Sequence, residues 1–148
     1  MEPLAPLIGT WSGRGHGEYP TIEPFDYEET ISFVHPGKPF LVYTQRTTNA
    51  ATGLPLHGEA GYWRFLPTGA LELVIAHPNG LAELAEGTVD GSLIQFRSTS
   101  ITGTATAKDV SVVERDFYLD GDSLRYELRM AAMGHPLTLH LSASLTRV

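Results

Sequence analysis

Turn-forming segments recur about every ten residues along this chain. They include "HPGKP" at 35–39, "PNG" at 78–80 and "DGD" at 120–122, and the runs between them are rich in β-branched and aromatic residues, as in "FLVYTQRTT" at 40–48. This spacing is typical of an all-β meander, sandwich or barrel. The only helix we expect is a short turn, either near the N-terminus or around residues 18–24.

Ten strands are predicted between these turns. They cover residues 9–17, 25–35, 40–48, 56–65, 70–77, 81–90, 92–101, 110–119, 123–133 and 136–147. A sheet with so many consecutive strands loses its exposed edges when it closes on itself. The predicted fold is therefore all-β, with a single domain over residues 1–148 that forms one antiparallel barrel of about ten strands, wide enough to hold a ligand.

The first predicted strand is bare on one face, because glycines there replace side chains. In "GTWSGRGHGEYPTI", residues 9–22, alternation places Gly13, Gly15 and Gly17 on one face between Trp11 and Tyr19. The glycines do not form a phosphate-binding G-x-G-x-x-G motif. Two compatible interpretations remain: close approach of a neighbouring backbone at a sharp barrel corner, or a flat ligand resting near the bare face.

The balance of charges narrows the class of partner. Lys and Arg total 10 against 17 Asp and Glu, which gives a formal net charge of −7. Nucleic acids and anionic membranes are bound by clustered cations, so we expect neither as a partner. The N-terminal "MEPLAPLIGTW" has no basic segment before a long apolar run, so no signal peptide is predicted. The chain also has no cysteine, which suits a reducing compartment, and the expected location is the cytoplasm.

His140 has the strongest local case for a ligand role, although none of the six histidines shows the spacing of a zinc motif. On a regular strand its neighbours on the same face are small Thr and Ser side chains, which leave space beside an imidazole. The opposite face is apolar, with Leu137, Leu139, Leu141, Ala143 and Leu145. One neutral imidazole nitrogen suffices to ligate haem iron. A polar face can equally point to water, and the sequence does not fix the register that decides between the two.

Longer motifs carry a family resemblance. "GTWSGRGHGEYPTI" begins with the Gly-x-Trp of the calycin group, which includes lipocalins and fatty-acid-binding proteins, and as a whole it resembles the first motif of the nitrobindin family of haem-binding β-barrels. Further matches to that family follow in order: "GKPFLVYTQRT" (37–47), "PLHGEAGYWR" (55–64), "ELVIAHPNGLAE" (72–83), "TAKDV" (106–110) and "MAAMGHPLTLHLSASL" (130–145). The resemblance runs from about Leu7 to Arg147.

The nitrobindin resemblance implies a ten-stranded barrel that holds one haem b per chain in a wide cleft. The iron ligand of the family is the histidine of the final-strand motif, which makes His140, and not His135, the expected metal-binding and catalytic residue. The pocket-lining positions of the family correspond to Leu56, His57, His77 and Met130. Thr21 and Lys108 are expected to contact the polar edge of the cofactor. For Lys108 the reason is that a cation near a haem propionate is favourable.

Members of that family hold ferric haem, bind nitric oxide and isomerise peroxynitrite to nitrate. The same function is expected here, and it requires no acid or base from the protein, in keeping with the lack of a G-x-S-x-G motif. Two alternatives stay open: a non-catalytic barrel that binds a fatty acid or another small hydrophobic ligand, and a haem-based nitric oxide sensor or carrier. The sequence also leaves a homodimer open.

Overall fold

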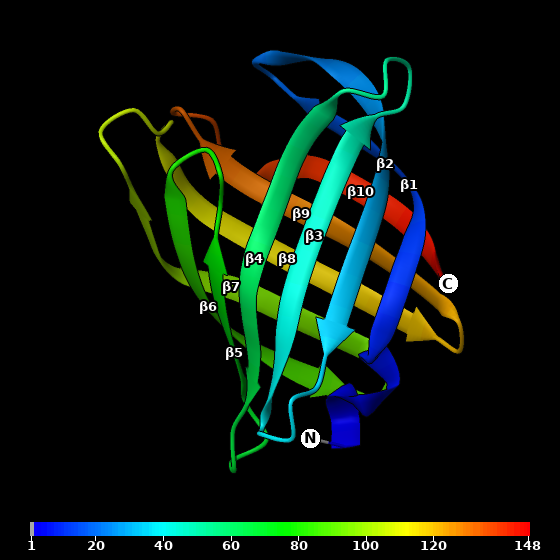
Figure 1. The fold of residues 1–148 in the computed structure, drawn as a ribbon. Helices are drawn as coiled ribbons and strands as arrows, with labels where there is room; N and C mark the ends of the chain where they lie inside the picture. Colours follow the sequence, from blue (N-terminus) through cyan, green and yellow to red (C-terminus); the bar gives the residue numbers. More distant parts are fainter. Residues whose placement is uncertain (1) are drawn as a thin grey trace.

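A computed structural model describes residues 2–148 as ten antiparallel strands in one closed barrel, ordered β1-β10-β9-β8-β7-β6-β5-β4-β3-β2 (Figure 1). The elements are η1 (Glu2–Leu7), β1 (Gly9–Tyr19), β2 (Ile22–Val34), β3 (Phe40–Asn49), β4 (Pro55–Phe65), β5 (Leu71–Ala76), β6 (Leu81–Asp90), β7 (Leu93–Gly103), β8 (Val110–Asp120), β9 (Ser123–Ala132) and β10 (Thr138–Arg147). The prediction of a ten-stranded antiparallel barrel is confirmed. The short helix is the N-terminal one, whereas residues 18–24 contain the end of β1, a turn and the start of β2.

The bare strand β1 closes the barrel by pairing with both β2 and β10. A Cβ at Gly13 would lie 2.1 Å from the carbonyl oxygen of Ser144 on β10, so only glycine allows this approach of the two backbones. At Gly15 and Gly17 the space of the missing side chains is filled by the rings of Tyr27 and Phe25 from β2. The first interpretation of the glycines is therefore correct, and aromatic rings of the same chain cover the bare face.

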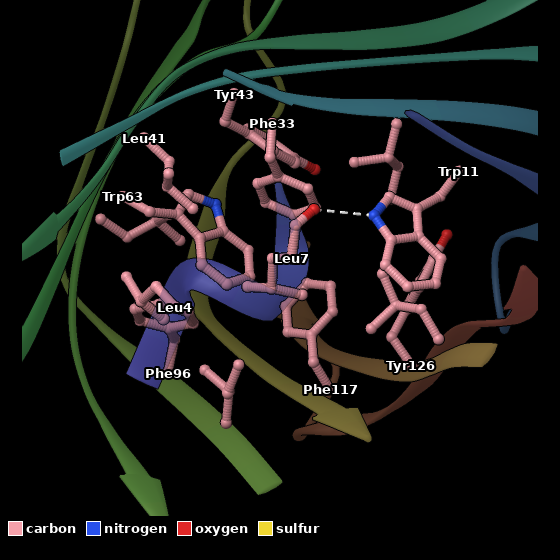
Figure 2. Packing of buried hydrophobic residues seen from close by; sticks show 14 of the residues in the cluster. Leu4, Leu7, Trp11, Phe33, Leu41, Tyr43, Trp63, Phe96, Phe117 and Tyr126 are labelled. Atoms are coloured by element: carbon pink, nitrogen blue, oxygen red, sulfur yellow. Dashed lines mark hydrogen bonds between the residues drawn. The ribbon is translucent and has the colours of Figure 1, made fainter. Parts of the chain in front are cut away.

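The N-terminal 3-10 helix η1 closes one end of the barrel (Figures 1 and 2). Its Leu4 and Leu7 are fully buried among the aromatic rings of the core, and the indole N–H of Trp11 donates a hydrogen bond of 2.9 Å to the carbonyl oxygen of Leu7. Trp63 lies at the centre of this core, 4.9 Å between ring centroids from Phe33 in an edge-on arrangement. Burial of this much aromatic surface is the main source of stability at this end.

The connections alternate between the two ends of the barrel, as they must when every strand pairs antiparallel to its sequence neighbour. The end opposite η1 therefore carries the β1–β2, β3–β4, β5–β6, β7–β8 and β9–β10 connections, at the top in Figure 1. Within residues 2–148, none of the helical segments has the length and apolar character required to cross a bilayer.

Candidate functional site

The residues proposed from the sequence for a cofactor site all lie at the end of the barrel opposite η1. Their positions are the β1–β2 turn for Thr21, the start of β4 for Leu56 and His57, the residue after β5 for His77, the β7–β8 loop for Lys108, the end of β9 for Met130 and the start of β10 for His140. Residues that are far apart in sequence thus share one end of the fold, because each lies next to a connection on that side.

A β-bulge determines the direction of His140. On β10, Leu139 lies opposite Arg129 and Leu141 lies opposite the adjacent Leu128. His140 is therefore the extra residue of the bulge. The bulge reverses the alternation: Leu139 is 38% exposed, whereas His140 is half-buried. The prediction that the leucines from 137 to 145 share one face is therefore wrong on the N-terminal side of the bulge.

The imidazole of His140 is held by the backbone of β1. Its Nδ1 lies 2.9 Å from the carbonyl oxygen of Glu18, and its ring packs edge-on against Tyr19, with 5.4 Å between ring centroids. A carbonyl oxygen only accepts hydrogen bonds, so Nδ1 carries the proton, and in the neutral ring Nε2 keeps a free lone pair. This is the tautomer that a metal ligand requires.

The surroundings of His140 also favour its neutral form. Burial lowers the pKa of His140 and repulsion from His57 lowers it further, against the hydrogen bond to Glu18, which raises it. A neutral imidazole is the form that binds metal ions.

Two further histidines, His57 and His77, are hydrogen-bonded to each other at this end of the barrel. Nε2 of His57 lies 3.1 Å from Nδ1 of His77, and Nε2 of His77 lies 2.9 Å from Oε1 of the buried Glu83. Burial would raise the pKa of Glu83, but Arg115 and His77 outweigh it and hold this pKa below its usual range. The ionised Glu83 accepts from Nε2–H of His77, so in the neutral rings Nδ1 of His77 accepts from Nε2–H of His57.

Below the histidines, Arg115 joins two carboxylates inside the barrel. Its Nη1 donates to Oε1 of Glu59 at 2.8 Å, and its Nη2 donates to Oε1 of Glu83 at 2.7 Å. Burial alone would raise the pKa of Glu59, but Arg115, with help from His57 and His77, holds it well below its usual range. Two carboxylates therefore share one guanidinium, which leaves this buried group with an excess of negative charge.

A third carboxyl group, Glu29, lies in a separate network on β2. Gln45 Nε2 donates to it at 2.6 Å and the Tyr126 hydroxyl donates at 2.7 Å, while the Tyr27 hydroxyl donates to that of Tyr126 at 2.7 Å. Burial raises the pKa of Glu29 to about 7, although both hydrogen bonds to it act in the opposite direction. Glu29 therefore titrates near neutral pH.

The remaining candidates lie around the rim. Thr21, Leu56 and Lys108 are exposed and Met130 is half-buried, with its carbonyl oxygen accepting a hydrogen bond of 3.1 Å from the hydroxyl of Tyr19. A shallow depression of about 480 Å³ lies elsewhere, outside the barrel over β1, β9 and β10. We assign the candidate site to the end of the barrel, because the convergent histidines and perturbed carboxyl groups lie there.

Sequence reasoning missed the acidic residues and the arginine inside the barrel. Each is a charged residue at an inward position of a strand that also buries large apolar side chains, such as Glu59 with Trp63 on β4 and Arg115 with Phe117 on β8. That break in an apolar alternation was the available signal. The support given to His140 by the main chain of Glu18 had no such signal, because every residue has a carbonyl group.

Comparison with known proteins identifies the family. The family described as "THAP4-like, heme-binding beta-barrel domain" matches residues 1–147. The chain belongs to this family. Among the relatives, "Peroxynitrite isomerase 2" of Mycobacterium avium is 55% identical over 151 aligned positions, covering 99% of this chain and 94% of the relative. "Peroxynitrite isomerase" of Nocardia farcinica is 53% identical, covering 97% of this chain and 88% of the relative.

A solved structure shows the same fold. The crystal structure of Rv2717c from M. tuberculosis superposes with a TM-score of 0.93 at 48% identity, covering 99% of this chain and 96% of that one. The two chains therefore share the closed ten-stranded barrel.

The residues present fit a haem. The family requires an iron ligand, and His140 offers an imidazole whose Nδ1 proton is fixed by the main chain and whose Nε2 lone pair is free. The exposed Lys108 lies on the same rim, where a cation would suit a haem carboxylate.

Proposed function

We propose that this protein binds one haem b, with His140 as the axial ligand of ferric iron, and isomerises peroxynitrite to nitrate. The observation that carries the proposal is the position of His140, turned to the barrel by the bulge and fixed in the metal-binding tautomer by Glu18. Relatives at 55% and 53% identity bear the name peroxynitrite isomerase. The cysteine-free composition suits the cytoplasm as its location.

The chain's own residues bind and orient the cofactor. His140 supplies the imidazole nitrogen, and Tyr19 packs against its ring. Four other residues at this end complete the proposed pocket: Leu56, His57, His77 and Met130. Thr21 and Lys108 lie on the rim, where Lys108 can pair with a carboxylate of the cofactor. Bound haem supplies the iron at which peroxynitrite isomerises and nitric oxide binds.

The test is a pair of histidine variants from the same short segment. The haem-loaded protein is expected to show a Soret band and to accelerate the decay of peroxynitrite in stopped-flow measurements. In His140→Ala the Soret band should no longer lie at its wild-type position, and the variant should no longer accelerate the decay of peroxynitrite. His135→Ala, in the neighbouring turn, should keep both properties. An unchanged spectrum in His140→Ala would refute the assignment of the ligand.

The interior disfavours the fatty-acid alternative. A cavity of about 10 Å³ inside the barrel, room for about one water molecule, is lined by charged residues such as Glu59 and Arg115 and by apolar residues such as Leu128. This volume is too small for an acyl chain. A nitric oxide sensor or carrier would use the same haem site, and turnover measured against the uncatalysed decay of peroxynitrite distinguishes it from an isomerase.

We also propose that a second copy of the chain binds to the outer face of the barrel. An apolar row crosses five adjacent strands there through directly paired residues: Val34, Val42, Tyr62, Val74 and Leu84. Four of these residues are exposed and Val42 is half-buried. An exposed apolar row is typical of an interface, and an isologous contact buries it on both copies. Sedimentation should show a dimer that dissociates in Val74→Lys and persists in Thr10→Lys; a monomeric wild type would exclude the dimer.

A further inference from the structure

The half-buried histidines His57 and His77 and the buried Glu59 bring three metal-binding atoms together. Nε2 of His57 lies 3.1 Å from Nδ1 of His77, and each of these atoms lies 3.7 Å from Oε2 of Glu59. The nearest point equidistant from the three atoms lies in their plane, about 2.0 Å from each, which matches the length of zinc–nitrogen and zinc–carboxylate bonds. The ligand set of two histidines and one glutamate is one that catalytic zinc sites use.

Neighbouring residues orient these ligands as they would in a metal site. The remaining ring nitrogen of His77 donates to the carboxylate of Glu83, the arrangement that fixes the tautomer of metal-binding histidines. Arg115 binds Glu59 through both of its carboxylate oxygens, at 2.8 and 3.3 Å, and so holds Glu59 in place. Both features are present before any ion binds, which lowers the cost of assembling the site.

The charge of this cluster also favours a cation. Glu59 and Glu83 are buried together with a single guanidinium, and Oε2 of Glu83 has no hydrogen-bond donor among the described residues. A buried carboxylate without full compensation is costly, so a divalent cation beside it is stabilised. The side chain of His57 is 29% exposed, which gives an ion a path from the barrel end.

We propose that His57, Glu59 and His77 form a binding site for a divalent transition-metal ion, with zinc as the best match, separate from the iron ligand His140. Binding replaces the hydrogen bond between the two imidazoles. His77 keeps its proton on Nε2, and His57 moves its proton to Nδ1, so two neutral rings bind the ion without releasing a proton. Three protein ligands leave the fourth position of the ion for water or a small anion.

The test is calorimetric titration of the full-length protein with zinc sulfate after dialysis against a chelator, carried out with and without haem. We expect one zinc ion per chain. His57→Gln and His77→Gln should each weaken binding by at least about 100-fold. Glu83→Gln, which changes the shared partner of His77 and Arg115 but no metal ligand, should weaken it by about 10- to 100-fold. Circular dichroism and thermal melting establish that each variant is folded.

Two control variants separate this site from other histidines. His16→Gln removes an exposed histidine paired with Asp26, and His140→Gln removes the proposed iron ligand; both should bind zinc as the wild type does. Equal zinc affinity in His57→Gln and the wild type, or loss of zinc binding in His140→Gln, would overturn the proposal. Because zinc binding is measured without reference to turnover, its failure is distinguishable from failure of the haem proposal.

A spectroscopic measurement identifies the ligands independently. Cobalt(II) added to the haem-free protein should give the intense visible bands of a four-coordinate site, and His57→Gln should abolish them. Bands typical of six-coordinate aqueous cobalt in the wild type would contradict the proposed geometry.

Discussion

Nδ1 of His140 is hydrogen-bonded to the main-chain carbonyl oxygen of Glu18 at 2.9 Å, across the junction of β10 and β1. The strand that closes the barrel therefore also fixes the tautomer of the proposed iron ligand. Because the acceptor is a backbone atom, the side chain of Glu18 takes no part in this interaction.

Glu18→Ala should leave haem binding within about twofold of the wild type, since the carbonyl group stays in place. A haem titration followed at the Soret band checks this. A large loss of affinity in Glu18→Ala would show that the carboxylate, and not the main chain, supports His140.

Tyr19→Phe should weaken the packing that holds the side chain of His140 in place. The variant keeps the ring that packs on His140, but it removes the hydroxyl that donates to the carbonyl oxygen of Met130 and accepts from the amide of Ala132. We expect a loss of about 2 kcal/mol in the free energy of unfolding and a roughly 10-fold weaker affinity for haem. Urea unfolding and haem titration measure the two effects, and Tyr118→Phe, at a half-buried tyrosine of β8 outside the proposed pocket, serves as the control for both.

Arg115→Met should be strongly destabilising, because it leaves Glu59 and Glu83 buried without their shared counter-ion. The expected loss in the free energy of unfolding is about 3–5 kcal/mol, measured by chemical denaturation. Arg64→Met removes an exposed ion pair with Glu72 and should cost less than about 1 kcal/mol. Similar losses in the two variants would contradict the assigned importance of the buried network.

Glu29 should make stability fall as pH rises towards neutral. Its pKa is 4.5 in the unfolded chain and about 7 in the folded protein, so the folded state binds more protons between these values. The contribution of Glu29 to the free energy of unfolding is fully present below pH 4.5. About 3 kcal/mol of it is lost as the pH rises to about 7. Glu29→Gln keeps an acceptor for Gln45 and should lack this fall, so the difference between the two unfolding curves across the pH range isolates Glu29.

Gly13→Ala should destabilise the closure of the barrel. The added Cβ would lie 2.1 Å from the carbonyl oxygen of Ser144 and 2.8 Å from Cα of Leu145, and backbone must move to admit it. We expect a loss of about 2–3 kcal/mol in the free energy of unfolding by thermal or chemical denaturation. Thr10→Ala, an exposed change on the same strand, is the matched control, and equal stability of both variants would refute the close approach.

Local chemistry in the sequence determined the number and type of strands. Turn segments such as the "DGD" at 120–122 form tight hairpins, with Gly121 at φ +59°, and alternation within each run set which face is apolar. The bare face of β1 could be predicted to need a covering layer for the same reason. What covers it, the rings of Tyr27 and Phe25, depended on the register of β2, which the sequence does not fix.

The sequence by itself determined a closed antiparallel barrel and singled out His140, because strand alternation, turn residues and ordered motifs are local properties. Only the tertiary structure decided where His140 points, since a one-residue bulge against β9 reverses the alternation. The tertiary structure alone also brought together His57, Glu59 and His77, whose spacing in the sequence matches no zinc motif. Their proximity follows from the pairing of β4 with β5, which brings residues of separate strands together at one end of the barrel.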